Sequence, residues 1–317
     1  MTRWGGGRVR QRTIAEKIAC TGVGLHSGKP VLLTLHPARA DSGIVFVRSD
    51  GAPPVEIRAT PASLTRTHLA TTLGRDDVHV DTVEHLLAAF YGLGIDNARV
   101  EVDGPEIPGM DGSAASFAYL IRSAGIYEQS APRRMLRVRR PIEISDGDRR
   151  IRVEPSDRLR ISYAIDFDHP LIGRQELRDF TVDEERFERE LAPARTFGFM
   201  AEVQALWRAG RARGASLDNT LVLDATRVLN RDGLRFADEF VRHKALDLLG
   251  DLALLGAELM GHVRVERGGH ALHQRLVSEL ASHHVLPAER GARPIGVSRA
   301  EIYQRLLGHR AAIAARA

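Results

Sequence analysis

The stretch Arg242-His243-Lys244-Ala245-Leu246-Asp247, with Asp251 one turn further on, decides how this chain is interpreted. Residues four apart on an α-helix lie on one face, so His243 and Asp247 point the same way. A neutral imidazole and a carboxylate placed like this can bind a divalent metal such as zinc. Asp251 extends the same face, which is unusual for a helix that is otherwise apolar. The alternative is a solvated i,i+4 pair, worth a few tenths of a kcal/mol.

A second pair of ionisable residues, Glu84-His85, lies early in another predicted helix. Adjacent helical residues point about a quarter-turn apart, so His85 can bind a metal while Glu84 faces a water molecule. A carboxylate is the usual base for such a water. His85, His243 and Asp247 would be three ligands with one position open, as in a catalytic zinc site. Taken alone, the pair also fits a solvated helix face.

His270 follows two glycines at the predicted start of a helix. A helix N-terminus lowers the pKa of a histidine, so a general acid at this position needs a carboxylate partner. Asp251 is the natural candidate for that partner. Without one, His270 is an ordinary turn residue.

Composition excludes several classes of protein. The chain has 317 residues, enough for two domains or one large one, and a net charge of +4. Basic residues are interleaved with acidic ones and not with aromatic residues, so we expect no nucleic-acid binding. The positive net charge is equally compatible with a basic groove that binds an anionic small substrate. No apolar run approaches the roughly 20 residues that span a bilayer, so we expect no stable membrane insertion.

Two further observations favour the cytoplasm. Residues 1–7 lack the apolar segment of a secretory signal. Cys20 is the single cysteine, which rules out an internal disulfide. We also expect a monomer, although the sequence leaves the oligomeric state open.

Hydrophobic periodicity predicts alternating strands and helices. Strands are predicted at 13–15, 31–35, 78–80, 98–102, 136–139, 151–154, 161–165, 221–223 and 263–266. Helices are predicted at 82–93, 113–124, 199–212, 236–259 and 270–281, with short ones opening at Thr181 and Ser298 and a linker at 132–134. Both halves place a histidine early in a helix that precedes a strand, which suggests two similar α+β halves with facing helices. The preference of helices for certain residues could by itself produce this similarity between the two halves.

Several longer motifs resemble one known family. They are Gly22-Val23-Gly24-Leu25-His26-Ser27-Gly28, Thr82-Val83-Glu84-His85-Leu86-Leu87-Ala88-Ala89, Gly92-Leu93-Gly94-Ile95-Asp96-Asn97, Pro105-Glu106-Ile107-Pro108, Met110-Asp111-Gly112-Ser113-Ala114, Arg195-Thr196-Phe197-Gly198-Phe199, Asp238-Glu239-Phe240-Val241-Arg242-His243-Lys244 and Gly269-His270-Ala271-Leu272. In this order, from about Thr13 to Leu280, they resemble the zinc-dependent UDP-3-O-acyl-N-acetylglucosamine deacetylases.

The resemblance implies a fold and a reaction. The fold would be two similar α+β domains, residues 1–130 and 131–317, each a sheet layered with paired helices, with the active site between them. The reaction would be hydrolysis of the 2-acetamido group of UDP-3-O-(3-hydroxyacyl)-N-acetylglucosamine, which yields acetate and the free amine. This is the committed step of lipid A synthesis in Gram-negative bacteria.

The resemblance also implies roles for the residues singled out above. His85, His243 and Asp247 would be the zinc ligands. Glu84 would be the base that activates water, and His270 the general acid, oriented by Asp251. The chemistry agrees, because zinc polarises an amide carbonyl and an amine leaving group must be protonated.

The family further implies contacts with the substrate. Thr196 would help to hold the tetrahedral oxyanion, and Lys244 and Phe197 would contact the substrate. The segment near 195–217 would form a passage for the acyl chain, because its apolar residues fall largely on one side of the predicted helix with arginines outside. The alternative is that this apolar side packs on the core.

Other functions stay open at this point. A zinc peptidase normally shows His-Glu-x-x-His on one helix, which this chain lacks. The remaining alternatives are another zinc amidohydrolase and a non-catalytic module that binds acyl chains or lipids. The sequence gives neither the preferred acyl length nor the native metal, zinc or iron. His68 is either a bystander, which we favour, or a second, inhibitory metal ligand, and the segment after about 283 matches no motif.

Overall fold

The computed structural model describes residues 10–67, 69–282 and 286–287. His68, the segment after 287 and the helix predicted at Ser298 lie outside these ranges, so their predictions stay untested. Within the described residues, no helix is both long enough and apolar enough to cross a bilayer.

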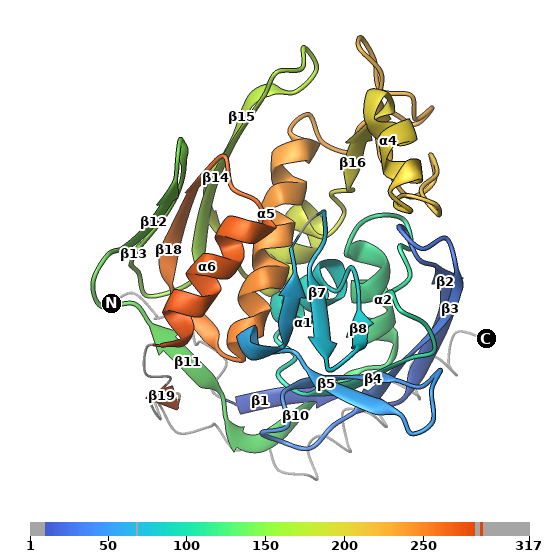
Figure 1. Ribbon diagram of the computed structural model, residues 1–317. Helices are drawn as coiled ribbons and strands as arrows, with labels where there is room; N and C mark the ends of the chain where they lie inside the picture. The colour runs from blue at the N-terminus through green and yellow to red at the C-terminus, as the bar shows by residue number, and fades with distance from the viewer. Residues whose placement is uncertain (1–9, 68, 283–285, 288–317) are drawn as a thin grey trace, which may run out of the picture.

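The N-terminal part is built on a five-stranded sheet (Figure 1). Its order is β2 (Ile18–Val23), β3 (Pro30–Pro37), β9 (Ala98–Val102), β4 (Ile44–Arg48) and β5 (Val55–Arg58), with β4 parallel to β9 and the other pairs antiparallel. β1 (Arg10–Ile14) pairs with β10 (Ile126–Pro132), and a small sheet joins β6 (Leu64–Arg66), β7 (Thr72–Arg75) and β8 (Val78–Val80). The helices here are α1 (Glu84–Leu93) and α2 (Ala115–Ser123).

The C-terminal part is built on a seven-stranded sheet. β18 (Glu258–Glu266) lies at its centre and pairs with β11 (Arg134–Arg137), β13 (Arg149–Pro155) and β14 (Arg160–Phe167). The remaining strands are β12 (Ile142–Asp146), β15 (Gly173–Thr181) and β19 (Leu286–Pro287). The helices are α3 (Glu184–Arg186), α4 (Val203–Arg208), α5 (Glu239–Leu252) and α6 (His270–Ala281), and β16 (Phe197–Phe199) pairs in parallel with β17 (Leu221–Leu223).

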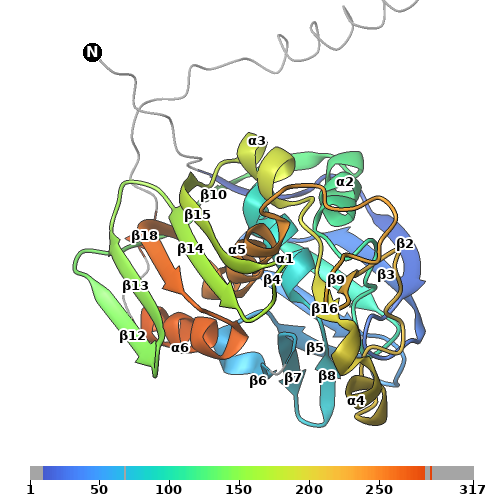
Figure 2. The same cartoon turned by 90° about the horizontal axis from the view of Figure 1, so that it is seen from above.

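α1 and α5 lie between the two large sheets and pack against each other (Figure 2). Both helices are buried almost all round, as expected for helices that form a core. α1 ends at Gly94, whose φ of 67° is the left-handed conformation that glycine favours at a helix end. The α+β fold with layered sheets and facing helices is therefore confirmed; the predicted boundary at residue 130 falls inside β10 and stays a prediction.

Two helix boundaries differ from their predictions. The helix predicted at 236–259 begins at Glu239 and ends at Leu252, because β18 starts at Glu258 after a turn at Gly256. The helix cap predicted at Thr181 is provided by Asp183, whose side chain accepts from the backbone of Arg186.

The predicted linker at 132–134 is a tight connection that is partly buried, not a solvated one. These residues join β10 to β11, and Arg133 is buried. Its guanidinium donates to Asp96 at 2.9 Å and also pairs with Glu258. An arginine-rich segment after proline resembles a solvated connection, but two carboxylates distant in the sequence compensate its charge here.

Candidate metal centre and catalytic site

α1 and α5 bring His85, His243 and Asp247 together in the core. The Nε2 atoms of His85 and His243 lie 3.6 Å and 3.4 Å from the same carboxylate oxygen, Oδ1 of Asp247. The two imidazole rings meet edge to face, with centroids 5.0 Å apart. All three side chains are buried, and their ligand atoms lie within 4.8 Å of one another.

The hydrogen bonds of this group leave its ligand atoms free. Asp247 Oδ1 is buried without a hydrogen-bond partner among the described residues, whereas Oδ2 accepts from Lys244 Nζ at 2.8 Å. His243 Nδ1 lies 3.1 Å from the carbonyl oxygen of Ala194, which fixes the proton on Nδ1 and leaves Nε2 with its lone pair. Burial lowers the pKa of His243 to about 4, so its ring is neutral. An unpartnered buried oxygen facing two such nitrogens fits a bound divalent cation.

Glu84 lies beside this group, at the start of α1. Its Oε2 accepts from the backbone N–H of Thr71 at 3.0 Å, and its Oε1 lies 3.9 Å from Nε2 of His270. Burial raises the pKa of Glu84 above its ordinary value. A carboxylate with a raised pKa at a buried site is suited to take up a proton.

His270 is the first residue of α6 and reaches the same site from the other side. Its Nδ1 lies 2.8 Å from Asp251 Oδ2, and its Nε2 lies 3.9 Å from both Glu84 Oε1 and Asp247 Oδ2. Burial opposes the charged ring, but the negative charge and hydrogen bond of Asp251 outweigh it and raise the pKa of His270 to about 9. The carboxylate partner expected for His270 is thus in place.

Two of the three residues expected to contact the substrate lie against the metal-binding group. Lys244, next to His243 on α5, is bound to Asp247. The Phe197 ring lies edge to face with His243, with centroids 6.3 Å apart, and packs on Phe240. Thr196 is half-buried and bound through its backbone to Gly112 and Leu221. The structure therefore brings Lys244 and Phe197 to the metal-binding group and places Thr196 next to Phe197.

A buried ion pair holds the segment of Thr196 and Phe197 against α5. Arg195 donates through Nε to Glu239 Oε1 at 2.9 Å, and both side chains are inaccessible or nearly so. The backbone N–H of Arg195 donates to the same oxygen. Ala194, whose carbonyl orients His243, is thereby fixed as well.

The segment near 195–217 differs from its prediction. Phe197 and Phe199 lie in β16, because the chain pairs there with β17, and the following helix is limited to Val203–Arg208. None of residues 200–209 is buried, and Trp207 and Met200 are 57% and 47% exposed. The alternative of core packing holds in part, because Phe197 and Phe199 pack against the core. On the helix itself Val203 and Leu206 are half-buried and Trp207 is exposed.

Residues that the sequence analysis did not single out complete the surroundings of Asp251. Thr71, Tyr163, His273 and Gln274 form a chain of hydrogen bonds around this carboxylate. His273 could have been found, because a spacing of three places it on the same helix face as His270. Thr71, just before β7, and Tyr163, on β14, are distant in the sequence and carry no local pattern.

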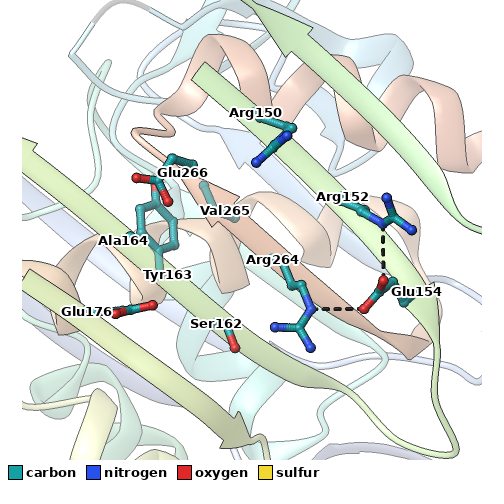
Figure 3. Close-up of a pocket in the computed structure, with 10 residues that line it drawn as sticks. All are labelled: Arg150, Arg152, Glu154, Ser162, Tyr163, Ala164, Glu176, Arg264, Val265 and Glu266. Carbon is teal, nitrogen blue, oxygen red and sulfur yellow. Dashed lines mark hydrogen bonds and ion pairs between the residues drawn. The ribbon is translucent and has the colours of Figure 1, made fainter. Parts of the chain in front are cut away.

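Figure 3 shows a separate hollow of about 370 Å³ on the large C-terminal sheet. Glu154 there accepts from Arg152 at 3.1 Å and from Arg264 at 2.9 Å. These side chains are partly exposed and compensate each other's charge, as is common on a solvated sheet face. We assign no function to this hollow.

Comparison with known proteins agrees with this geometry. A sequence profile for the family described as UDP-3-O-acyl N-acetylglycosamine deacetylase matches residues 11–282. A UDP-3-O-acyl-N-acetylglucosamine deacetylase of Myxococcus xanthus is 51% identical over 284 residues, covering 88% of this chain and 90% of that protein. A protein of the same name from Acidithiobacillus ferrooxidans is 52% identical over 276 residues, covering 86% of this chain and 90% of the relative.

Proposed function

The chain belongs to the UDP-3-O-acyl N-acetylglycosamine deacetylase family, and from this premise we propose that its buried His85–His243–Asp247 group forms the centre of a zinc-dependent deacetylase. The enzyme hydrolyses the 2-acetamido group of UDP-3-O-(3-hydroxyacyl)-N-acetylglucosamine to acetate and the free amine, the committed step of lipid A synthesis. The observation that supports this site best is the unpartnered Asp247 Oδ1 facing two histidine nitrogens.

His85, His243 and Asp247 are the residues that would hold the metal, and two nitrogens and one oxygen are a ligand set that zinc accepts. A zinc ion bound there supplies a Lewis acid, which polarises the amide carbonyl and lowers the pKa of water. Iron is the alternative metal, since imidazole and carboxylate ligands suit both. Lys244 keeps Asp247 charged and turns its free oxygen toward the histidines.

Glu84 is the base of the proposed reaction. Its carboxylate takes a proton from the water that attacks the amide carbonyl. The backbone N–H of Thr71 holds one carboxylate oxygen, so the other stays directed at the site. Burial raises the pKa of Glu84, which makes it a stronger base than an exposed glutamate.

His270 is the acid of the proposed reaction. Its Nδ1–H is bound to Asp251, so the proton that it donates is carried on Nε2, the atom that faces the site. A raised pKa of about 9 keeps the ring protonated at neutral pH. The proton goes to the amine nitrogen as the carbon–nitrogen bond breaks.

Substrate contacts follow from the residues around this group. Lys244 and Phe197 bind the substrate beside His243, and Thr196 helps to hold the oxyanion. The exposed apolar side of α4 and the strand before it form one wall of the acyl-chain passage, because a fatty chain would cover residues that are otherwise in water. The cytoplasmic location and monomeric state expected from the sequence remain part of this proposal.

An assay of acetate release from the acylated UDP-sugar tests the function. We expect activity with the purified enzyme, loss of activity with a chelator and recovery with zinc. Release of acetate from simple N-acetyl sugars at the same rate would favour another amidohydrolase. Binding of the acylated sugar without any turnover by the metal-loaded protein would favour a lipid-binding module.

A further inference from the structure

Asp251 is held by more hydrogen bonds than the reaction proposed above requires. Its Oδ2 lies 2.8 Å from Nδ1 of His270 and 2.8 Å from Nδ1 of His273. Its Oδ1 accepts from Thr71 Oγ1 at 2.6 Å and from Gln274 Nε2 at 2.8 Å. An ionised carboxylate offers about four acceptor sites, so every site of Asp251 is in use.

His273 is the partner of Asp251 that the reaction leaves unexplained. It lies one turn after His270 on α6 and is fully buried. Its Nε2 lies 3.0 Å from the hydroxyl oxygen of Tyr163 on β14, which is also fully buried. Burial lowers the pKa of His273 and raises the pKa of Tyr163, so the first is a neutral imidazole and the second a neutral phenol.

These neighbours determine which nitrogen of His273 carries the proton. A neutral imidazole has one N–H and one lone pair. Nδ1 faces a carboxylate oxygen at 2.8 Å, so it has to be the donor, and Nε2 accepts the hydrogen bond from the Tyr163 hydroxyl. The phenol therefore supports the tautomer that binds Asp251.

The backbone leaves room for this pair at Gly268. A Cβ atom on Gly268 would lie 2.4 Å from Val265 Cγ1, 2.6 Å from the Tyr163 hydroxyl oxygen and 3.1 Å from His273 Nε2. The turn that leads into His270 therefore packs closely on Val265 and on the hydrogen bond between Tyr163 and His273. A side chain at this position would have to displace one of these three residues.

We propose that His273, supported by Tyr163, is a positioning residue that fixes the Asp251 carboxylate from a second direction and so keeps the His270 ring directed at the metal-binding group. The proposal rests on the role of His270 given under the proposed function. The hydrogen bond from His273 to Asp251 matters because His270 has a competing partner. Thr71 Oγ1 lies 3.2 Å from His270 Nδ1 as well as 2.6 Å from Asp251 Oδ1. If the carboxylate rotated, His270 would turn toward Thr71 and its Nε2 would leave the site.

Asp251, His270 and His273 also lie close enough to resemble a second metal-binding group. The hydrogen bonds argue against a metal there. Both Nδ1 atoms are at hydrogen-bond distance from one oxygen and must be protonated, whereas a ligand nitrogen must be unprotonated. Two bound metals per chain, the second lost in a His273 variant, would overturn the positioning role.

The tautomer of His273 can be measured without reference to activity. Long-range ¹H–¹⁵N spectra of the zinc-loaded protein report which ring nitrogen carries the proton, and the His273→Asn variant assigns the signals by their loss. We expect a neutral ring protonated on Nδ1 throughout the pH range of activity. A ring protonated on Nε2 would overturn the proposal.

Kinetics test the consequence for His270. The double variant His273→Leu/Tyr163→Phe removes the donor without leaving a buried hydroxyl unpaired. We expect kcat to fall roughly tenfold, the magnitude typical of losing a residue that orients a functional histidine, with KM and metal content unchanged and a lower melting temperature, because Asp251 Oδ2 loses a buried donor. His273→Asn should restore kcat, because its amide nitrogen can stand in for Nδ1. Unchanged kcat in the double variant, or no recovery with asparagine at equal melting temperature, contradicts the proposal.

His262 provides a matched control in the same part of the protein. It is buried on β18, and its Nε2 bonds to a hydroxyl, Ser162 Oγ, at 2.9 Å, but it does not bind Asp251. His262→Asn should leave kcat unchanged; an equal loss would mean that the effect is not specific to Asp251. If the double variant does not fold, the tautomer measurement on the wild-type protein still tests the positioning role of His273. A wild-type protein without deacetylase activity would instead overturn the proposed function and leave the tautomer result standing.

Discussion

A Cβ atom on Gly250 of α5 would lie 2.1 Å from the backbone carbonyl oxygen of Glu84 on α1. The two helices therefore touch at a glycine, beside the residue that precedes His85 and within one turn of Asp247. Because two of the proposed ligands lie on one helix and one on the other, this contact sets the distance between them.

We predict that Gly250→Ala loosens both the core and the metal site. The added methyl group has no room, and overpacking of this kind costs about 1–3 kcal/mol in the free energy of unfolding. Denaturant unfolding and metal titration measure the two effects. Gly51→Ala is the control, since a Cβ atom there meets no neighbour within 4 Å. Wild-type stability and metal affinity in Gly250→Ala would show that the helices can separate freely.

Metal content should distinguish a ligand from a base. We predict about one metal per chain, strongly reduced in Asp247→Ala and retained in Glu84→Gln, because Asp247 Oδ1 faces the histidines whereas Glu84 is held by Thr71. Elemental analysis after dialysis measures this. Equal metal loss in both variants would contradict the separate roles.

The pH profile of kcat/KM should be bell-shaped. Glu84 must be deprotonated, so activity is gained as the pH rises through its raised pKa. His270 must be protonated, so activity is lost as the pH rises through its pKa of about 9. Glu84→Gln should remove the acidic limb and His270→Gln the basic limb, each with residual activity. A limb that persists in its variant belongs to another group.

The acyl chain should contribute strongly to turnover. Each methylene removed from water is worth about 0.8 kcal/mol, so we predict that unacylated UDP-N-acetylglucosamine is a very poor substrate. Ala215→Trp should narrow the passage and reduce kcat/KM for a long-chain substrate more than for a short-chain analogue. Equal kcat/KM values for acylated and unacylated substrates would rule the passage out.

The buried ion pair between Arg195 and Glu239 should matter far more than an exposed one. Arg195→Leu leaves Glu239 buried and unpaired, which costs about 3–5 kcal/mol in the free energy of unfolding. Arg189→Leu is the matched control, because its pair with Glu185 is largely exposed and should contribute little. Similar losses in both variants would show that the Arg195 pair is not buried in solution.

The parts of the fold predicted best are those decided by short-range periodicity. α6 has the predicted bounds, and α1, β8, β9 and β17 lie where the hydrophobic pattern placed them. His243 and Asp247 could be paired from their spacing alone, because one helix fixes their relation. The link to His85 is a hypothesis drawn from its own Glu-His pair and supported by the family resemblance, since no spacing rule places α1 beside α5.

The parts predicted worst depend on partners distant in the sequence. Arg133 is buried only because Asp96 and Glu258 meet it there. Phe197 and Phe199 form a strand because β17 lies beside them, although the sequence predicts a helix that begins at residue 199. Thr71 and Tyr163 reach Asp251 and His273 across the fold, where no spacing rule applies.

The ligands of the proposed metal come from both parts of the chain, which makes the metal a thermodynamic link between them. A ligand that binds only the folded arrangement adds RT ln(1 + [L]/Kd) to its stability, about 2.7 kcal/mol at a hundredfold excess over Kd. The melting temperature should therefore rise with the free metal concentration. A chelator would then act on this protein twice, by stopping the reaction and by weakening the contact between α1 and α5.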